Sequence, residues 1–280
     1  MAYESRGIAA RDQALGGLLV GQRGAVRELR YTMYQQHVRR GARVISMAGG
    51  AGQELGPAKA VGASEFRLFD ISPDSVAEAS RRMSRSLQSA HVADCWAPDF
   101  LDVAARALGA DPRGRFDAVC CNLALHYAWD SPKRASTAVR NAAAFLRPGG
   151  VFFGLVSDAE VALERRDAGA RRGEWALSGD KGWCVRARFE AGGGYRFNLR
   201  DPGVRDQRTG RSWRLFMGEV PLEYGVHSEE LKALADAAGF RALCPSWAPA
   251  LELLRPCTPL DPLNAEIVRT YAAFAFQKRI

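Results

Sequence analysis

The sequence predicts an α/β protein built around a doubly wound, mostly parallel β-sheet. Short apolar runs alternate with amphipathic stretches over residues 42–156, an alternation typical of consecutive βαβ units. The first run leads into a glycine-rich turn, and the second and third runs end in aspartate. This is expected where a parallel sheet opens onto a ligand. After residue 157 the pattern changes to hairpin-like strands, which predict an antiparallel insertion beside the sheet.

Length and composition fit one folded domain. A chain of 280 residues with 47% hydrophobic and 25% charged residues can bury a sizeable core. The net charge is +8, and 34 of the 39 basic residues are arginine. Because a guanidinium group pairs well with phosphate, this excess favours a nucleotide or nucleic-acid partner. A GC-rich coding sequence is an equal alternative, since alanine and glycine are abundant too.

The cysteines and the hydropathy pattern exclude several classes. The six cysteines form no C-x-x-C motif and no cluster with histidine at metal-ligand spacing, so we expect no metal site and no disulfide framework. No stretch approaches the roughly 18 apolar residues that a membrane span needs, and no signal-peptide core begins the sequence. We therefore expect an intracellular protein, in the nucleus or the cytoplasm, without a membrane partner.

The first half of the sequence predicts a cofactor site. The elements expected there are a helix at 25–38, strand 42–48, helix 53–61, strand 66–70, a helix from Ser72 to about residue 87, and strand 90–94. Gly49–Gly52 would bring backbone close to a nucleotide-like ligand. Asp70, about 20 residues after these glycines, suits the two hydroxyl groups of a ribose. Asp94 suits an exocyclic amine such as that of adenine. Together they predict an adenosine-containing cofactor.

The fourth strand leads into the centre of the predicted site. The next elements are expected as helix 98–108, strand 118–123, helix 132–146, a tight turn at 147–150 and strand 151–156. His126 and Tyr127 follow the fourth strand at the point where a ligand crevice opens in such sheets. A buried core histidine and a core tyrosine are the alternative interpretation of this pair. The sequence contains no G-x-G-x-x-G motif, which argues against a dinucleotide dehydrogenase.

The remaining sequence predicts a lid and a closing strand. We expect a charged helical stretch at 157–175, strands at 182–190, 194–199 and 212–220, turns and a loop at 191–194 and 200–211, a helix at 228–238 and a last strand at 271–277. An insertion of this kind beside a sheet is a candidate substrate lid. The whole chain is expected to form one domain with a basic N-terminal helical arm (1–40), a cofactor-binding core (41–156), the insertion (157–226) and a C-terminal helix with closing strands (227–280).

These motifs resemble those of the mRNA cap guanine-N7 methyltransferases, a family within the Rossmann-like, class I methyltransferases that use S-adenosylmethionine. The resemblance extends from about Leu29 to Lys278. Its motifs are Phe116-Asp117 with His126-Tyr127, LRPGG at 146–150, GYRFNL at 194–199, VPLEYGV at 220–226 and YAAFAFQK at 271–278. The first two suit many methyltransferases, and the last three together are typical of cap enzymes.

The resemblance implies a role for each matching residue. Asp70 would hold the cofactor ribose, Asp94 the adenine, and Tyr127 the methionine end. His126 and Glu223 would face the cap guanine. Arg82, 12 residues after Asp70, would lie near the cap phosphates. Further cofactor contacts implied by position are His37, Ala48, Gly50 and Asn122.

The implied chemistry needs no general base. Guanine N7 carries a free lone pair, so methyl transfer depends on proximity, alignment and electrostatics. The guanine becomes cationic during transfer, and a Glu223 carboxylate at its edge would favour the transition state. The implied cofactor is S-adenosylmethionine without a metal. The implied partners are 5′-capped RNA and either a triphosphatase/guanylyltransferase capping enzyme or an activating subunit.

The sequence also departs from the family pattern. Ser46 stands where the family has an acid, and Ala48 where it has glycine. Lysines of the family correspond to Ala51, Pro57 and His37, and an asparagine to Met33; Trp247 lies near the expected position of a late aromatic residue. Two further functions are therefore compatible with the sequence: a methyltransferase for another nucleotide or small molecule, and a non-catalytic RNA-binding relative or scaffold subunit.

Overall fold

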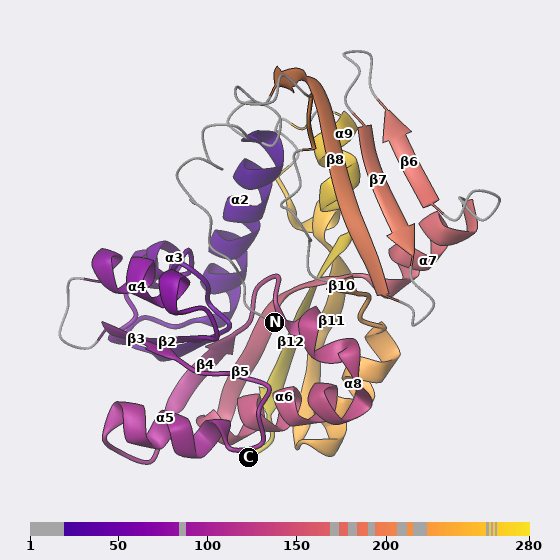
Figure 1. The fold of residues 1–280 in the computed structure, drawn as a ribbon. Helices are drawn as coiled ribbons and strands as arrows, with labels where there is room; N and C mark the ends of the chain where they lie inside the picture. Colours follow the sequence, from indigo (N-terminus) through magenta and orange to yellow (C-terminus); the bar gives the residue numbers. More distant parts are fainter. Residues whose placement is uncertain are drawn as a thin grey trace.

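A seven-stranded, mostly parallel sheet forms the centre of the protein, and six of its strands are those that the sequence predicts (Figure 1). The computed structural model describes residues 20–83, 88–168, 174–178, 184–189, 194–205, 212–214, 223–255, 258, 260 and 262–280. The strands are β1 (Arg43–Met47), β2 (Glu65–Asp70), β3 (Gln88–Val92), β4 (Phe116–Cys120), β5 (Leu146–Ser157), β11 (Phe240–Pro249) and β12 (Tyr271–Lys278). Their order is β11-β12-β5-β4-β1-β2-β3.

Five of these strands are mutually parallel, and β12 runs against both of its neighbours. β1 pairs in parallel with β2 and β4, and β3 and β5 extend the parallel part on either side. β12 is antiparallel to β5 and β11. The strand order reverses between β1 and β4, and in such sheets the ligand crevice lies outside the carboxyl ends of the strands at this point.

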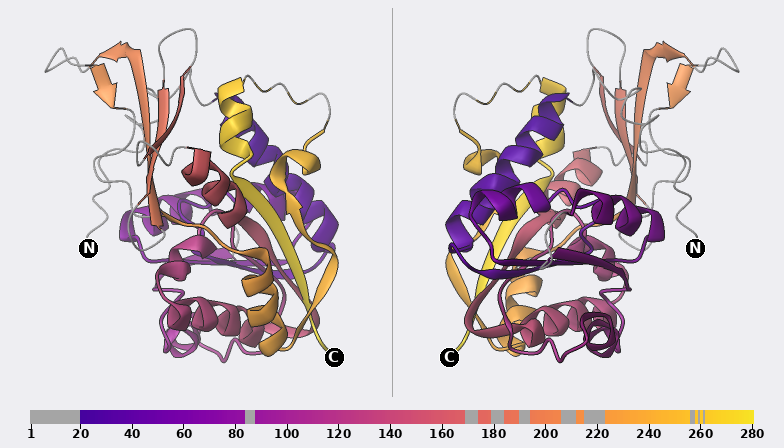
Figure 2. Two further views of the ribbon diagram at one scale, coloured as in Figure 1. Left: turned by 90° about the vertical axis from the view of Figure 1, so that its right-hand side faces the viewer. Right: turned by 90° about the vertical axis from the view of Figure 1, so that its left-hand side faces the viewer.

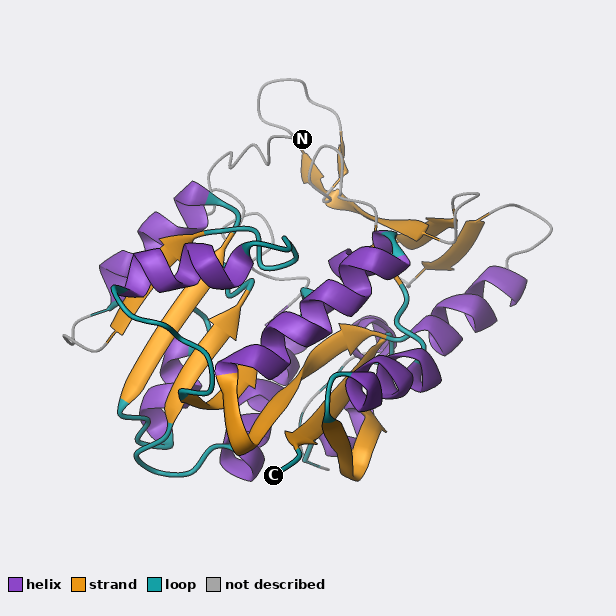
Figure 3. Cartoon of the chain, turned by 90° about the horizontal axis from the view of Figure 1, so that it is seen from below, coloured by secondary structure: helices purple, strands orange, loops and turns teal. Residues whose placement is uncertain are grey.

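Helices cover both faces of the sheet (Figure 3). They are α2 (Val20–His37), α3 (Leu55–Ala60), α4 (Pro73–Arg82), α5 (Phe100–Leu108), α6 (Pro132–Phe145), α7 (Ala159–Ala168), α8 (Ser228–Ala237) and α9 (Pro262–Val268), with 3-10 turns η1 (Leu125–Asp130) and η2 (Ala250–Leu253). Neighbouring strand residues point to opposite faces: Ile45 packs in the layer of α5, α6 and α8, and Val44 in the layer of α2, α3, α4 and α9. Among the described helices, none is long and apolar enough to cross a membrane.

The helix starts follow local sequence signals. Ser72 and Ser131 cap α4 and α6 by accepting hydrogen bonds from the backbone N–H groups of Ser75 and Arg134, and a proline follows each cap. Such caps satisfy donors that the first helical turn leaves unpaired. In α4 this signal starts the helix directly after Asp70, at the end of β2.

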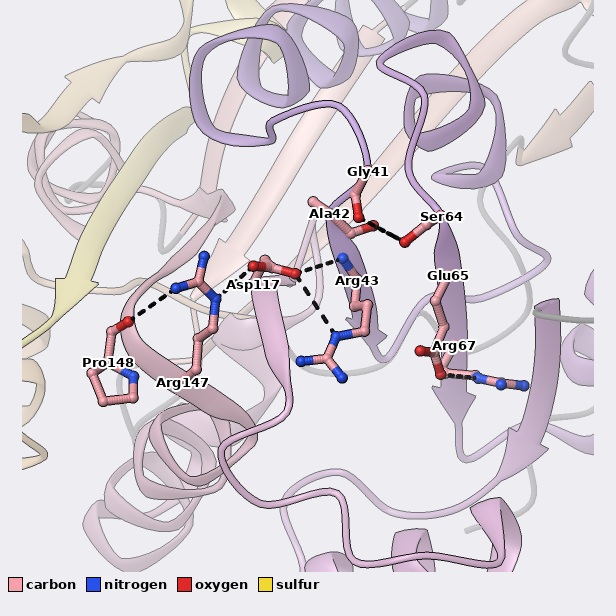
Figure 4. Close-up of polar contacts among 9 residues, drawn as sticks. All are labelled: Gly41, Ala42, Arg43, Ser64, Glu65, Arg67, Asp117, Arg147 and Pro148. Carbon is pink, nitrogen blue, oxygen red and sulfur yellow. Dashed lines mark hydrogen bonds and ion pairs between the residues drawn. The ribbon is translucent and has the colours of Figure 1, made fainter.

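The amino ends of three strands are joined by one carboxylate (Figure 4). Asp117 Oδ2 accepts a 2.8 Å hydrogen bond from the backbone N–H of Arg43, and Asp117 Oδ1 accepts one of 2.6 Å from Arg147 Nε. Burial raises the pKa of the Asp117 carboxyl. The hydrogen bonds and charges of Arg43 and Arg147 lower it by more than burial raises it, so the pKa lies below its usual value. The Phe116-Asp117 motif and the arginine of LRPGG thus hold β1, β4 and β5 together at the edge opposite the predicted crevice.

The smaller sheet is the predicted antiparallel insertion, and it projects beyond the larger one (Figure 2). Its strands are β6 (Glu174–Ser178), β7 (Cys184–Phe189), β8 (Gly194–Arg205), β9 (Ser212–Arg214) and β10 (Glu223–Tyr224). The two ends of the inserted segment lie side by side at the large sheet. There Asp158 and Val226 form a parallel bridge, and the Val226 N–H donates to Ser157 O.

Two predicted loop segments are wrong. The turn expected at 147–150 belongs to β5, where a register irregularity opposite Phe116–Ala118 and the positive φ of Gly149 accommodate the glycines within the strand. Residues 200–205 continue β8 instead of forming a loop, and the pairing with β9 shifts register between Arg200 and Arg205, as at a bulge. Residues 206–211 and 215–222 of the predicted loop and strand lie outside the described residues.

Candidate active site

Asp70 organises the carboxyl edge of the sheet. One carboxylate oxygen accepts a 2.8 Å bond from the Gly50 N–H, and the other accepts a 2.9 Å bond from the Ser72 N–H. The side chain is buried, and each oxygen keeps acceptor capacity beyond these bonds. The predicted ribose acceptor is therefore fixed against the glycine turn that was expected to approach the cofactor.

The glycine turn packs tightly against side chains of β1 and β2. A Cβ added at Gly49 would lie 2.5 Å from Ser46 Oγ and 2.7 Å from Leu68 Cδ1, so this position cannot hold a side chain without a shift. Gly50 has a φ of +54°, a conformation that glycine adopts without steric cost. Side-chain packing thus favours glycine at position 49, and the backbone conformation favours it at position 50.

Two residues with side chains share this left-handed conformation. Ala48 has a φ of +50° and Leu123 a φ of +54°, and they follow β1 and β4 respectively. Such a conformation costs a residue with a Cβ roughly 1–2 kcal/mol, and strained positions of this kind cluster at functional sites. Ala48, which stands where the family pattern has glycine, thus adopts a conformation that glycine adopts without steric cost, and its N–H donates to Cys95 Sγ at 3.3 Å.

Asp94 lies two residues after β3 and is held by two partners. Its Oδ1 accepts a 2.9 Å bond from the Trp96 N–H, and its Oδ2 lies 3.4 Å from an Arg134 nitrogen. Arg134 in turn pairs at 2.7 Å with Asp130, the last residue of η1. The carboxylate is partly exposed, as an adenine-binding group requires, and it is linked to the turn that carries His126 and Tyr127.

The surface beside these aspartates is apolar. Ile71, directly after Asp70, is 62% exposed, and Val92, two residues before Asp94, is 51% exposed. Apart from the chain end, they are the only large hydrophobic residues counted as exposed among those described. An uncovered apolar surface next to two carboxylates fits an adenosine group, whose base is flat and apolar and whose ribose and amine donate hydrogen bonds.

A buried polar cluster lies on the other side of β1. Asn122 Nδ2, two residues after β4, donates a 2.9 Å bond to Glu54 Oε2. The other oxygen, Glu54 Oε1, lies 2.9 Å from Arg30 Nε of α2, close enough for an ion pair although no hydrogen bond is aligned between them. Burial raises the pKa of Glu54, and the Arg30 charge and the Asn122 bond oppose that rise.

His126 is buried within the η1 turn. It is 2% exposed, and neither ring nitrogen has a hydrogen-bond partner among the residues that the structure describes. Burial lowers its pKa to about 3, so the ring is neutral at physiological pH. The Tyr127 ring lies against it, with 4.3 Å between ring centroids. The pair predicted from the sequence thus sits next to the strand ends, beside Asn122 and Leu123.

Glu223 comes to this turn from the insertion. It lies in β10, opposite Tyr195 of β8, and β10 packs against η1. The topology therefore brings the element that carries Glu223 to the element that carries His126 and Tyr127, across almost 100 residues of sequence.

Two predicted site residues, His37 and Arg82, contact residues outside the groups described so far. His37 ends α2 and packs its ring on Phe153, inside β5, with 5.5 Å between centroids; burial lowers its pKa. Arg82 ends α4 and pairs with Glu78 at 2.9 Å. Since α4 begins beside Asp70, Arg82 lies about 15 Å along the helix axis from that end. The proposed cofactor and phosphate roles of these two residues remain predictions.

Sequence reasoning missed Glu54, Arg30 and Arg134. Glu54 follows the glycine turn directly, and an acid after such a turn was the available signal; the partners Arg30 and Asn122 are distant in sequence and gave none. Within the described part of the chain, no three His, Cys, Asp or Glu side chains gather as a metal site would require.

The fold is that of the S-adenosylmethionine-dependent methyltransferases. A solved structure of such an enzyme from Clostridium acetobutylicum superposes with a TM-score of 0.56 at 11% identity, over 90% of this chain and 92% of that one. The family model for the mRNA (guanine-N7)-methyltransferase domain matches residues 26–180, more than half of the chain. The chain belongs to this family.

Curated relatives agree with this assignment. The mRNA cap guanine-N7 methyltransferase of Cryptococcus neoformans is 26% identical over 209 residues, which is 71% of this chain and 31% of that protein. The Saccharomyces cerevisiae enzyme is 32% identical over 138 residues, which is 47% of this chain and 31% of that protein. The matched stretches thus span about a third of the length of these relatives.

Proposed function

We propose that this protein transfers a methyl group from S-adenosylmethionine to guanine N7 of the cap on 5′-capped RNA. The observation that carries the proposal is the contact of η1 with β10 next to the strand ends of the sheet. There the histidine-tyrosine pair, the strand of Glu223 and the carboxylates of Asp70 and Asp94 come from four separate regions of the sequence to one edge. Membership of the family supports the same reaction and the same cofactor.

The residues present fit this cofactor. Asp70 and Asp94, with the exposed Ile71 directly after Asp70, suit the adenosine. Asn122 Oδ1 is buried without a hydrogen-bond partner among the described residues, and it suits a donor group beyond β4. When bound, S-adenosylmethionine supplies a methyl group made electrophilic by the sulfonium.

The chain's own residues then align the acceptor. His126 is neutral at physiological pH, so it can present a hydrogen-bonding or packing surface without repelling a guanine that becomes cationic. A Glu223 carboxylate at the guanine edge would attract that charge as it develops. No proton has to be removed from N7, so the site needs no general base.

The decisive experiment is methyl transfer from labelled S-adenosylmethionine. We expect label on an RNA that begins with GpppG and none on an uncapped RNA of the same sequence, with 7-methylguanosine released when the cap is digested. Cofactor binding without transfer to either RNA would contradict the proposed function, and negligible cofactor affinity would instead favour a non-catalytic relative. Preferential methylation of free nucleotides or small acceptors would assign the site to another substrate.

Two substitutions should separate the acceptor side from the cofactor side. Glu223→Ala should lower the methylation rate strongly and leave the Kd of S-adenosylmethionine nearly unchanged. Asp70→Ala should instead raise that Kd about tenfold or more, because it removes a charged acceptor from the ribose. Calorimetry and the capped-RNA assay measure the two effects. A loss of cofactor affinity in Glu223→Ala would contradict the assigned role.

A further inference from the structure

Glu54 is a buried carboxylate to which the proposed reaction gives no part. It is 3% exposed and lies between the glycine turn and α3. An ionised carboxylate is costly to bury unless its oxygens are paired. Here one oxygen faces Arg30 of α2 and the other accepts from Asn122 Nδ2. The cluster therefore joins three elements at the strand ends of β1 and β4.

The Glu54 carboxylate determines how the Asn122 amide is turned. A carboxylate can only accept hydrogen bonds, so the amide must direct its nitrogen towards Glu54; the reverse orientation would bring two oxygen acceptors together. The Asn122 oxygen is thereby turned away from Glu54. It is buried and accepts no hydrogen bond from the part of the chain that the structure describes. A buried acceptor without a partner at a ligand edge indicates a missing donor.

The position of this acceptor indicates which donor it would take. In the strand order β4-β1-β2-β3, Asp70 and Asp94 follow β2 and β3, on one side of β1. Asn122 follows β4, on the other side. A cofactor whose adenosine lies over Asp70 and Asp94 would therefore extend its amino-acid end across the glycine turn towards Asn122. The donor that this end carries is the α-ammonium group.

We propose that Glu54 is a positioning residue that orients Asn122 so that its side-chain oxygen accepts the α-ammonium group of the cofactor. This inference rests on the proposed use of S-adenosylmethionine and adds a residue to it. Arg30 of α2 holds the Glu54 carboxylate in place.

The test compares two ligands that differ at the amino-acid end. S-adenosylhomocysteine and 5′-methylthioadenosine share the adenosine, but only the first carries the amino-acid group. Glu54→Gln keeps the shape of the side chain, but the new amide group can donate a hydrogen bond. The Asn122 side chain is then free to turn its oxygen towards residue 54 and away from the cofactor. We expect the Kd of S-adenosylhomocysteine to rise about tenfold or more, the usual effect of losing a hydrogen bond to a charged group. The Kd of 5′-methylthioadenosine should stay within about twofold of the wild type.

Further variants protect the test against misfolding. Asn122→Ala removes the acceptor while leaving Glu54 and Arg30 together, and it should show the same ligand selectivity. The double variant should lose little more than either single one, because both act through one oxygen. Asp102→Asn, at an exposed ion pair with Arg113, is the matched control and should bind both ligands as the wild type does.

The positioning role of Glu54 and the proposed function fail with different results. Equal losses for both ligands would mean a general distortion of the site and would overturn the positioning role, as would no loss for either. Wild-type protein that binds neither ligand would overturn the proposed function itself.

Discussion

At the scale of single residues, His126 has an unusual environment. A buried imidazole with neither nitrogen bonded is an uncommon arrangement, since buried polar groups normally find partners. The packing interpretation of this histidine and the guanine-facing one both agree with its burial at the sheet edge. They differ in what the ring does when the substrate is present. Because neither nitrogen has a partner within the described part of the chain, a role that a bound ligand completes is favoured.

His126 should make stability depend on pH. Its pKa is about 3 in the folded state and about 6.5 when unfolded, so the unfolded chain binds the extra proton first as pH falls. Stability from this group is therefore complete above about pH 6.5 and is lost progressively towards pH 3, by up to about 1.4 kcal/mol per pH unit. Urea unfolding at several pH values should show a shallower loss in His126→Asn than in the wild type.

The same substitution at the exposed His227 provides the control. It should leave the pH dependence of stability unchanged. Parallel curves for His126→Asn and the wild type would mean that the histidine is not held neutral in the folded protein.

At the scale of elements, the motifs that make the sequence recognisable mostly build the scaffold. Asp117 and Arg147 tie the amino ends of the strands. From the YAAFAFQK motif, Gln277 Nε2 donates to Gly149 O, and Lys278 Nζ donates to the carbonyl oxygens of Ala143 and Leu146 at the end of α6. A cation at a helix carboxyl terminus satisfies unpaired carbonyls there. Asp117, Arg147, Gln277 and Lys278 therefore lie at the edge opposite the site and position it indirectly.

Asp117→Asn should consequently reduce stability and spare binding. The amide can accept only through one oxygen, so one of the bonds to Arg43 and Arg147 is lost, at a cost of about 1–3 kcal/mol. We expect a lower midpoint of urea unfolding with an unchanged slope, and a Kd for S-adenosylhomocysteine equal to that of the wild type. A large change in that Kd, measured under conditions where the variant is fully folded, would mean that the Asp117 hydrogen bonds affect the site.

At the scale of the whole molecule, the sequence predicted the parts with local signals. The first five strands, the helices between them and the positions of Asp70 and Asp94 follow from hydrophobic runs and capping residues close in sequence. β6, β11 and α9 were missed, and the first residues of β6 fall within the stretch predicted to be helical. The pairing of β11 with β12 shifts register between Ala242 and Trp247, which interrupts the regular alternation that identifies a strand.

The contacts of the site were harder to predict than its strands. Asn122 and Glu54 are 68 residues apart, and nothing local to either names the other as partner. The same holds for Arg134, which reaches Asp94 across 40 residues. The turn expected at 147–150 failed for the opposite reason. Its proline and glycines carry a strong local signal, but β5 pairs with β4 at Leu146 and again from Val151 onward, so these residues form an irregularity within the strand.

The meeting of Ser157 and Val226 gives the molecule a modular construction. Because the N–H of Val226 donates to the carbonyl of Ser157, the polypeptide leaves the large sheet and re-enters it at adjacent points. Everything between them is a closed excursion, and lengthening such an excursion adds little entropy cost to folding. The insertion is therefore the part of this architecture whose length and sequence can change with the least effect on the folding of the large sheet.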